Sequence, residues 1–199
     1  MPPAITVPII LAAGTARRMG SNKLIADLGG KPVLVHVIDA VEAAGLGPPL
    51  IVLGHAAEAV RAVVGARCAN FVDAPGYRGG MAHSIAAGIT ALPPEAVATI
   101  ICLGDMPFTD PRILRRLAAG AAADAILVPV HAGRRGNPVL WGSAYFQQLA
   151  SLRGDVGARQ LLDMFADRVS MIDWSDDSIH VDIDTPDMLA RLGGRLIPR

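Results

Sequence analysis

The sequence predicts an α/β protein, with a three-layer α/β/α architecture in which helices cover both faces of a mostly parallel, Rossmann-like sheet. Short apolar runs typical of buried strands alternate with stretches of helical periodicity along most of the 199 residues. No internal repeat or low-complexity linker interrupts this alternation. Because a chain of this length can bury one proper core, we expect a single domain over residues 1–199.

The predicted elements follow one another in a regular order through the first two thirds of the chain. Strands are expected at the apolar runs 7–11, 50–53, 71–72, 99–103 and 126–130. Helices are expected at 32–44, with proline in the first turn and a glycine at the end, at 56–64, at 81–91 and from residue 111. Short strands near Val139, Met171 and Val181 and helices near Gly157 and Thr185 complete the set. Such a sheet binds its ligand in a crevice at the carboxyl ends of the strands.

Charge and composition exclude several classes of partner and indicate the cellular location. The 18 lysines and arginines balance the 18 aspartates and glutamates, so we expect no nucleic-acid partner. The amino-terminal residues lack the basic start of a signal peptide, and no apolar run reaches the 18 residues of a membrane span. Cys68 and Cys102 are isolated, which favours two buried free thiols over a disulfide or metal site. These features indicate a cytoplasmic protein without a membrane partner.

The most informative stretch is residues 9–23, IILAAGTARRMGSNK. The small residues Ala12, Ala13 and Gly14 follow the first apolar run and let backbone amides approach a ligand, and three cations follow them: Arg17, Arg18 and Lys23. This combination suits a bound polyphosphate. The stretch is neither a P-loop nor a dinucleotide fingerprint, because a serine replaces the P-loop lysine and an alanine the second fingerprint glycine. A glycine-containing surface turn with solvated cations is the alternative.

Two acidic turns are candidate metal sites. Asp105, in Gly-Asp-Met-Pro directly after a buried run, is expected at a strand end that faces the same crevice as Gly14. Asp184, in Asp-Ile-Asp-Thr-Pro-Asp, follows residues 179–183, whose alternation predicts an edge strand; Asp182 is a weaker candidate. Magnesium prefers one or two carboxylates together with phosphate oxygens. Either aspartate also has an ordinary explanation as a turn former or as an acid near a helix amino terminus.

Three further loops are candidate substrate contacts. Gly80 opens the helix that carries Ser84, so its free amides would be available to a base or a phosphate. Residues 134–140 combine Arg135 with a flexible glycine, Asn137 and a short strand, and residues 154–159 bring Arg159 to the start of a helix. Each loop alone is a weak indication.

Taken together, these stretches resemble the motifs of the MobA-like nucleotidyltransferases, in the family's order from Leu11 to Asp187. The first motif, L-A-A-G-x-S-x-R-M-G-x-x-K, is matched except that Ala16 stands where serine or glycine is usual. G-D-M-P, G-N-P-V-L, G-D-x-G-A-R and D-I-D-T-P follow along the chain, and G-N-P-V-L and G-D-x-G-A-R resemble the molybdenum cofactor cytidylyltransferases. Relatives that use guanosine triphosphate typically read L-A-G-G, so Ala13 indicates cytidine triphosphate.

The resemblance implies a fold of the nucleotide-diphospho-sugar transferase type, with a nucleotide-binding part at about 5–110 and an acceptor-binding part at about 111–192. It implies these roles: catalysis by Arg18, Lys23 and Asp105; nucleotide binding by those three and by Leu11, Ala12, Ala13, Gly14, Gly80 and Ser84; Mg²⁺ binding by Asp105 and Asp184; acceptor binding by Arg135, Asn137 and Arg159.

The implied reaction joins the nucleotide of CTP to the phosphate of a molybdopterin-type acceptor and releases pyrophosphate. A phosphate nucleophile is already ionised near neutral pH, so no protein base is needed. A molybdoenzyme of the xanthine dehydrogenase type is the expected partner downstream. Three alternatives stay open: a transferase for a sugar phosphate or methylerythritol phosphate, a cofactor-binding chaperone without chemistry, and a purely structural interaction protein.

Overall fold

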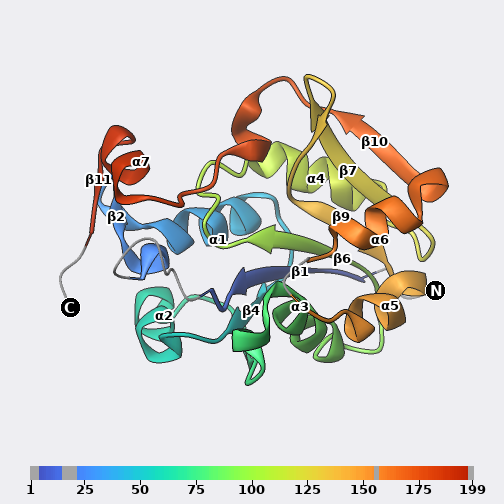
Figure 1. Cartoon of the computed structure of the whole chain (residues 1–199), viewed down its shortest axis with the longest axis horizontal. Coiled ribbons are helices and arrows are strands. Elements are labelled where there is room, and N and C mark those ends of the chain that lie inside the picture. Colours follow the sequence, from blue (N-terminus) through green and yellow to red (C-terminus); the bar gives the residue numbers. More distant parts are fainter. Residues whose placement is uncertain (1–4, 15–21, 155–156, 197–199) are drawn as a thin grey trace.

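A mixed sheet of eight strands forms the centre of the computed structural model, which describes residues 5–14, 22–154 and 157–196 (Figure 1). The path of neighbouring strands is β10-β7-β9-β6-β1-β4-β5, and β8 pairs with β7. The bounds are β1 Ile5–Ala12, β4 Leu50–Leu53, β5 Asn70–Asp73, β6 Ala96–Leu103, β7 Ile126–His131, β8 Arg134–Arg135, β9 Val139–Gly142 and β10 Val169–Asp173.

The half of the sheet around β1 is parallel, which brings the carboxyl ends of its strands to one edge. β1 pairs in parallel with β4 on one side and with β6 on the other, and β4 pairs in parallel with β5. β9 runs antiparallel to both β6 and β7, so β7 has the direction of β6. The arrowheads of β1 and β6 accordingly point to the same end of the molecule (Figure 1).

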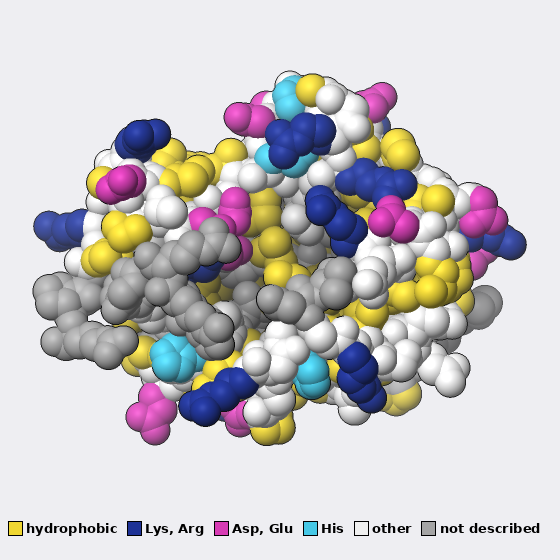
Figure 2. Space-filling model, viewed as in Figure 1, with side chains coloured by type: hydrophobic (Ala, Val, Ile, Leu, Met, Phe, Trp, Pro, Cys, Tyr) yellow, Lys and Arg dark blue, Asp and Glu magenta, His cyan; other side chains and the backbone are white. Residues whose placement is uncertain are grey.

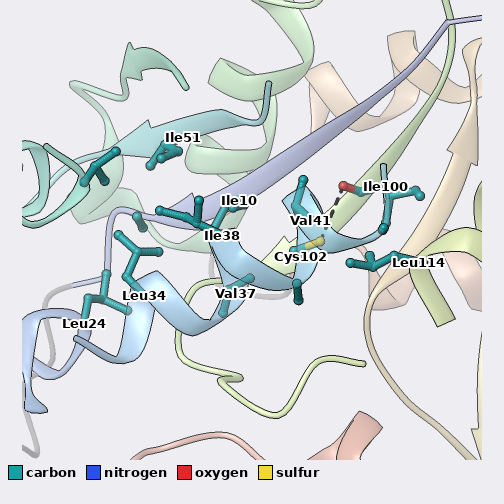
Figure 3. Close-up of a cluster of buried hydrophobic side chains, with 14 of the residues drawn as sticks. Ile10, Leu24, Leu34, Val37, Ile38, Val41, Ile51, Ile100, Cys102 and Leu114 are labelled. Carbon is teal, nitrogen blue, oxygen red and sulfur yellow. Dashed lines mark hydrogen bonds between the residues drawn. The ribbon is translucent and has the colours of Figure 1, made fainter. Parts of the chain in front are cut away.

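Helices cover both faces of the sheet because strand residues alternate between two buried clusters. One cluster joins Ile10 of β1 to α1 Val33–Ala43, α2 Ala57–Val64 and α4 Pro111–Ala119 (Figure 3). The other joins Ile9, the adjacent residue, to the helices of the opposite face: α3 Met81–Thr90, α5 Phe146–Ser151 and α6 Arg159–Met164. Successive side chains of a strand point to opposite faces, so one apolar run serves both layers. The predicted three-layer α/β/α fold is confirmed.

A second, smaller sheet joins the segment after the first motif to the carboxyl-terminal part of the described chain. β2 Asp27–Leu28 pairs with β3 Lys31–Pro32 and with β11 Gly194–Arg195, all antiparallel. α7 Pro186–Arg191 lies beside this sheet at one end of the molecule (Figure 1). A small cluster holds the unit together, with Ile183 and Leu189 from the carboxyl-terminal side packed on Ala26, Leu28 and Val33.

The remaining short elements are single helical turns of the 3-10 type. They are η1 Lys23–Ile25, η2 Tyr77–Gly79, η3 Ser143–Tyr145, η4 Ala166–Arg168 and η5 Asp177–His180. The last of these corrects one prediction: residues 179–183, with Val181, do not form an edge strand. The Asp176 side chain accepts a hydrogen bond from the Ser178 backbone N–H, which caps a turn instead.

A second correction concerns the cysteines. Both thiols are free, but Cys68 is exposed and only Cys102 is buried. Within the described ranges, no helix is both long and apolar enough to cross a membrane.

Candidate functional site

The site begins where β1 and β6 end side by side. The Gly104 N–H donates a hydrogen bond to the Leu11 carbonyl (3.0 Å), which extends the pairing of the two strands by one residue. A side chain at position 104 has no room, because a Cβ there would lie 2.8 Å from the same carbonyl oxygen. The turn after β6 therefore leaves directly beside the turn after β1, and it carries Asp105 to that edge, as the sequence predicts.

Lys23 is the first residue of η1, and its side chain extends to this edge. The Asn22 side chain accepts a hydrogen bond from the Leu24 N–H (3.0 Å) and caps η1, whose Leu24 is buried against the core. This local anchor places the Lys23 Nζ 2.6 Å from Asp105 Oδ2 and 2.7 Å from Asp184 Oδ1. The Lys23 side chain is only 13% exposed, so this ammonium is shielded from most of the solvent.

The segment that carries Asp184 is tied to the turn of Asp105. The Ile183 N–H donates to the Asp105 carbonyl (2.9 Å), and the Ile183 side chain is completely buried in the small cluster. On the far side, the Thr185 hydroxyl accepts from the Met188 N–H (3.2 Å) and caps α7, which has proline in its first turn. The predicted helix cap and the predicted metal ligand thus occur together in neighbouring residues.

Three carboxylates form one acidic cluster at this edge. Asp105, Asp182 and Asp184 each offer an oxygen, and these atoms all lie within 4.8 Å of one another. Ligands on opposite sides of a magnesium ion are about 4.2 Å apart, so small side-chain movements would make the set fit a divalent cation. The sequence left Asp182 and Asp184 as alternatives, whereas the structure brings both to the cluster.

Burial and neighbouring charges both shift pKa values in the cluster: they oppose each other at Lys23 and act in the same direction at Asp182. Burial, the largest influence, lowers the pKa of Lys23, but the charges and hydrogen bonds of Asp105 and Asp184 outweigh it and raise that pKa above its ordinary value. The pKa of Asp182 is raised, first by burial and then by the nearby charges of Asp184 and Asp105. A divalent cation would relieve the repulsion among the three carboxylates.

The small residues of the first motif lie next to the cluster. Leu11 is partly buried at the end of β1, Ala12 and Ala13 are buried, and Gly14 is exposed. No described atom comes within 4 Å of a Cβ placed on Gly14, so its backbone is open to a ligand. Arg17 and Arg18, the other cations of the motif, lie outside the described residues.

The two further nucleotide candidates belong to α3. Gly80 precedes the helix with φ +107°, and its position has no side-chain cap, so the first amides of α3 have no side-chain acceptor at the cap. Ser84 is on the inner side of the helix and only 5% exposed. Gly154 contributes its carbonyl to the Ala82 N–H (3.3 Å), which brings the loop before α6 to the same helix end.

The acceptor candidates come from three later segments: Arg135 lies in β8, Asn137 shortly before β9, and Arg159 at the start of α6. Asn137 is half-buried, and its N–H donates to the Ile179 carbonyl (3.0 Å). Arg135 pairs with Asp163 (2.9 Å), whereas Arg159 is exposed at the first position of α6. The Asn137 contact leads along the chain to Asp182 and Asp184. Among the described site residues, Lys23 forms direct ion pairs with Asp105 and Asp184.

A further group of residues beside the first motif escaped the sequence interpretation. Gly54, directly after β4, is so close to it that a Cβ would lie 2.7 Å from the Ala13 Cβ and 2.8 Å from the Tyr77 Cβ. The His55 N–H donates to the Ala13 carbonyl (3.4 Å), and the rings of His55 and Tyr77 are 6.3 Å apart. Their position could have been predicted in the same way as that of Asp105, because Gly54 and His55 also directly follow a buried parallel strand.

One face of the molecule is hollowed (Figure 2). Figure 2 shows a depression near the middle of the face, with acidic side chains on one edge, basic side chains on the opposite edge and apolar side chains on its floor. A depression with cationic and anionic groups at its margin suits a ligand that carries both negative charge and a bound metal ion.

Comparison with known proteins identifies a family and a curated protein whose sequences are similar to this chain. Residues 8–170 match the family model of the MobA-like NTP transferase domain. The bifunctional protein GlmU of Burkholderia thailandensis is 40% identical over 119 residues, which are 59% of this chain and 26% of GlmU. The matched region thus spans about a quarter of that curated relative.

Solved structures resemble the chain over nearly its full length. Rv0371c from Mycobacterium tuberculosis is 29% identical with a TM-score of 0.82, covering 95% of this chain and 97% of that chain. The same protein has been solved in complex with manganese, with a TM-score of 0.80. A nucleotidyl transferase from Methanothermobacter, 21% identical with a TM-score of 0.82 over 94% of this chain and 95% of that chain, shares the fold.

Proposed function

The chain belongs to the MobA-like NTP transferase domain family, and we propose that it is a Mg²⁺-dependent nucleotidyltransferase. It transfers the nucleoside monophosphate of CTP to the phosphate of a molybdopterin-type acceptor and releases pyrophosphate. The observation that carries this proposal is the contact of one shielded lysine, Lys23, with Asp105 and Asp184 at the edge of the sheet where β1 leads into the exposed Gly14. This arrangement offers a cation for phosphate and carboxylates for a metal in one place.

Each group has a distinct task in the proposed reaction. The Gly14 backbone and the Lys23 ammonium bind the phosphates of the nucleotide, and Arg18 of the same motif is proposed to assist them. Asp105 and Asp184, with Asp182 beside them, would hold Mg²⁺, which neutralises phosphate charge when bound. The resemblance to a relative solved with manganese supports a divalent cation at these carboxylates.

The nucleophile needs orientation more than activation. An acceptor phosphate is already ionised near neutral pH, so the protein can act by positioning it in line with the α-phosphorus and by stabilising the negative charge that develops. Arg135, Asn137 and Arg159 are the proposed acceptor contacts. Asn137 is linked through Ile179 to the segment that leads to Asp182, which supports a shared acceptor side.

The nucleobase and the acceptor are the finer parts of the proposal. Support for CTP comes from Ala13, because relatives that use guanosine triphosphate typically have glycine at this position of the first motif. Support for molybdopterin comes from the order of the G-N-P-V-L and G-D-x-G-A-R segments in the sequence.

A pyrophosphate-release assay tests all parts of this proposal. The purified protein is given each of the four ribonucleoside triphosphates with Mg²⁺ and with molybdopterin, molybdenum cofactor, a sugar 1-phosphate or methylerythritol phosphate. We expect release with CTP and the pterin acceptor only. Release with another pair would move the proposal to another acceptor class, and pterin binding without any release would replace it by a chaperone function.

A further inference from the structure

The ammonium of Lys23 lies against two of the carboxylates that would bind the metal. Its Nζ is 2.6 Å from Asp105 Oδ2 and 2.7 Å from Asp184 Oδ1, both direct hydrogen-bonding distances. The third carboxylate, Asp182, has an oxygen within 4.8 Å of the other two. Lys23 and a divalent cation would therefore use the same carboxylates.

The two cations compete because they carry like charge and need the same carboxylates. A metal bound to the carboxylates would lie within a few ångströms of a resident ammonium, and the Lys23 side chain is only 13% exposed, so solvent screens the repulsion less than at an open surface. A lysine can leave such a contact by rotation about its four-carbon stem, provided that another anion receives it. In the proposed reaction the phosphates of the nucleotide are that anion.

We propose that Lys23 excludes free metal from the site and changes partner, from Asp105 and Asp184 to the phosphates, when a metal–triphosphate complex arrives. This inference rests on the proposed function and specifies its substrate. The protein binds the metal and the nucleotide together, as one metal–triphosphate complex. The lysine keeps the carboxylates neutralised and together in the absence of nucleotide, and it makes the binding of metal and of triphosphate mutually favourable.

Metal binding without turnover tests the exchange. Mn²⁺ affinity is measured by electron paramagnetic resonance of the free ion, with and without CTP, for the wild type, Lys23→Met, Lys23→Arg and Lys31→Met. The last is a matched control, because Lys31 is the only other lysine and pairs with Asp39. Circular dichroism and thermal unfolding show that each variant is folded.

The expected Mn²⁺ affinity depends on whether residue 23 carries a positive charge. Lys23→Met should bind free Mn²⁺ about tenfold more tightly than the wild type, a coupling within the usual range, and should bind the Mn–CTP complex more weakly. Lys23→Arg and Lys31→Met should exclude free Mn²⁺ as the wild type does. The exchange is refuted if Lys23→Met gains no Mn²⁺ affinity, or if Lys23→Arg gains as much.

The outcome is separable from that of the proposed function. Free Mn²⁺ affinity is measured without nucleotide or acceptor, so a protein that shows the expected changes but releases no pyrophosphate would keep the lysine as a competitor of the metal and lose the transferase. Conversely, pyrophosphate release with unchanged Mn²⁺ affinity in Lys23→Met would keep the transferase and lose the exchange.

Discussion

A single absent side chain at Gly104 determines how closely the two central turns approach. A Cβ there would lie 2.8 Å from the backbone oxygen of Leu11 and 3.1 Å from the Leu34 Cδ1. The neighbour at the shortest distance is backbone, which cannot rotate away as a side-chain end can. The glycine of the Gly-Asp-Met-Pro motif is thus a packing requirement of the site, whatever further role it has.

We predict that Gly104→Ala lowers the free energy of unfolding by about 1–3 kcal/mol, the usual cost of overpacking. Gly47→Ala is the control, because nothing lies within 4 Å of its Cβ and its φ is not in the left-handed region. Urea unfolding of both variants measures the difference. Equal stability of the two would show that the turn after β6 has room that the structure does not give it.

The two cysteines should differ sharply in reactivity. Burial raises the pKa of the Cys102 thiol to about 12, whereas Cys68 is exposed. Only a thiolate attacks a thiol reagent, so at pH 8 the folded protein should react at one site and the unfolded protein at two. Mass spectrometry after brief iodoacetamide treatment identifies the site. Rapid labelling of Cys102 in the folded protein would contradict its place in the core.

At the scale of elements, the sequence predicts most of the structure where apolar runs are long. The strand at 50–53 has the predicted bounds, and α1, α2 and α3 lie within a residue or two of theirs. β2, β3 and β11 were not foreseen, since two-residue strands show no periodicity and β11 pairs with a partner far away in the chain. α5 was also missed.

The wrong strand at 179–183 has a local cause. Its alternation of apolar and polar residues fits a strand, but Asp176 caps η5 through Ser178 and also accepts from the Trp174 indole N–H (3.2 Å). Side-chain hydrogen bonds to nearby backbone compete with strand pairing, and here they prevail. Asp184 still reaches the acidic cluster, because its position depends on Ile183 and Thr185, which lie beyond the turn.

Ile183→Ala should lower both the free energy of unfolding and the affinity of the site for Mn²⁺–CTP. Its side chain is completely buried in the small cluster, so we expect a loss of about 2–4 kcal/mol and a weaker hold on the carboxylates at either side. Ile5→Ala, with Ile5 41% exposed, should cost much less. Urea unfolding gives the first effect and Mn²⁺–CTP affinity the second. A destabilised variant with unchanged affinity would show that the cluster does not position Asp182 and Asp184.

At the scale of the whole molecule, the central sheet links the segments that carry the sequence motifs. Both core clusters include residues of β1, one on each face, so the helices of the two faces share their central strand. The predicted positions of Lys23 and Asp105 follow from this topology, because parallel strands end at one edge. The contact with Asp184, 161 residues from Lys23, needed the small sheet and could not be read from the sequence.

We propose on these grounds that the chain is one domain and predict that it unfolds as one unit. Urea denaturation followed by far-ultraviolet circular dichroism and by tryptophan fluorescence should give coincident transitions, because Trp141 and Trp174 contact the two different clusters. Separate transitions would divide the chain into independently stable parts.

The central claim is that Asp105 and Lys23 belong to a catalytic centre rather than to a structural ion pair. Asp105→Asn keeps the shape of the side chain and removes the charge that would hold the metal. The measurement is the single-turnover rate of CMP transfer to the acceptor with saturating Mg²⁺, compared with Asp167→Asn, whose carboxylate is 79% exposed and pairs with the adjacent Arg168. We predict a rate loss of about 100-fold or more for Asp105→Asn and none for Asp167→Asn. A folded Asp105→Asn variant that transfers at the wild-type rate would contradict the account.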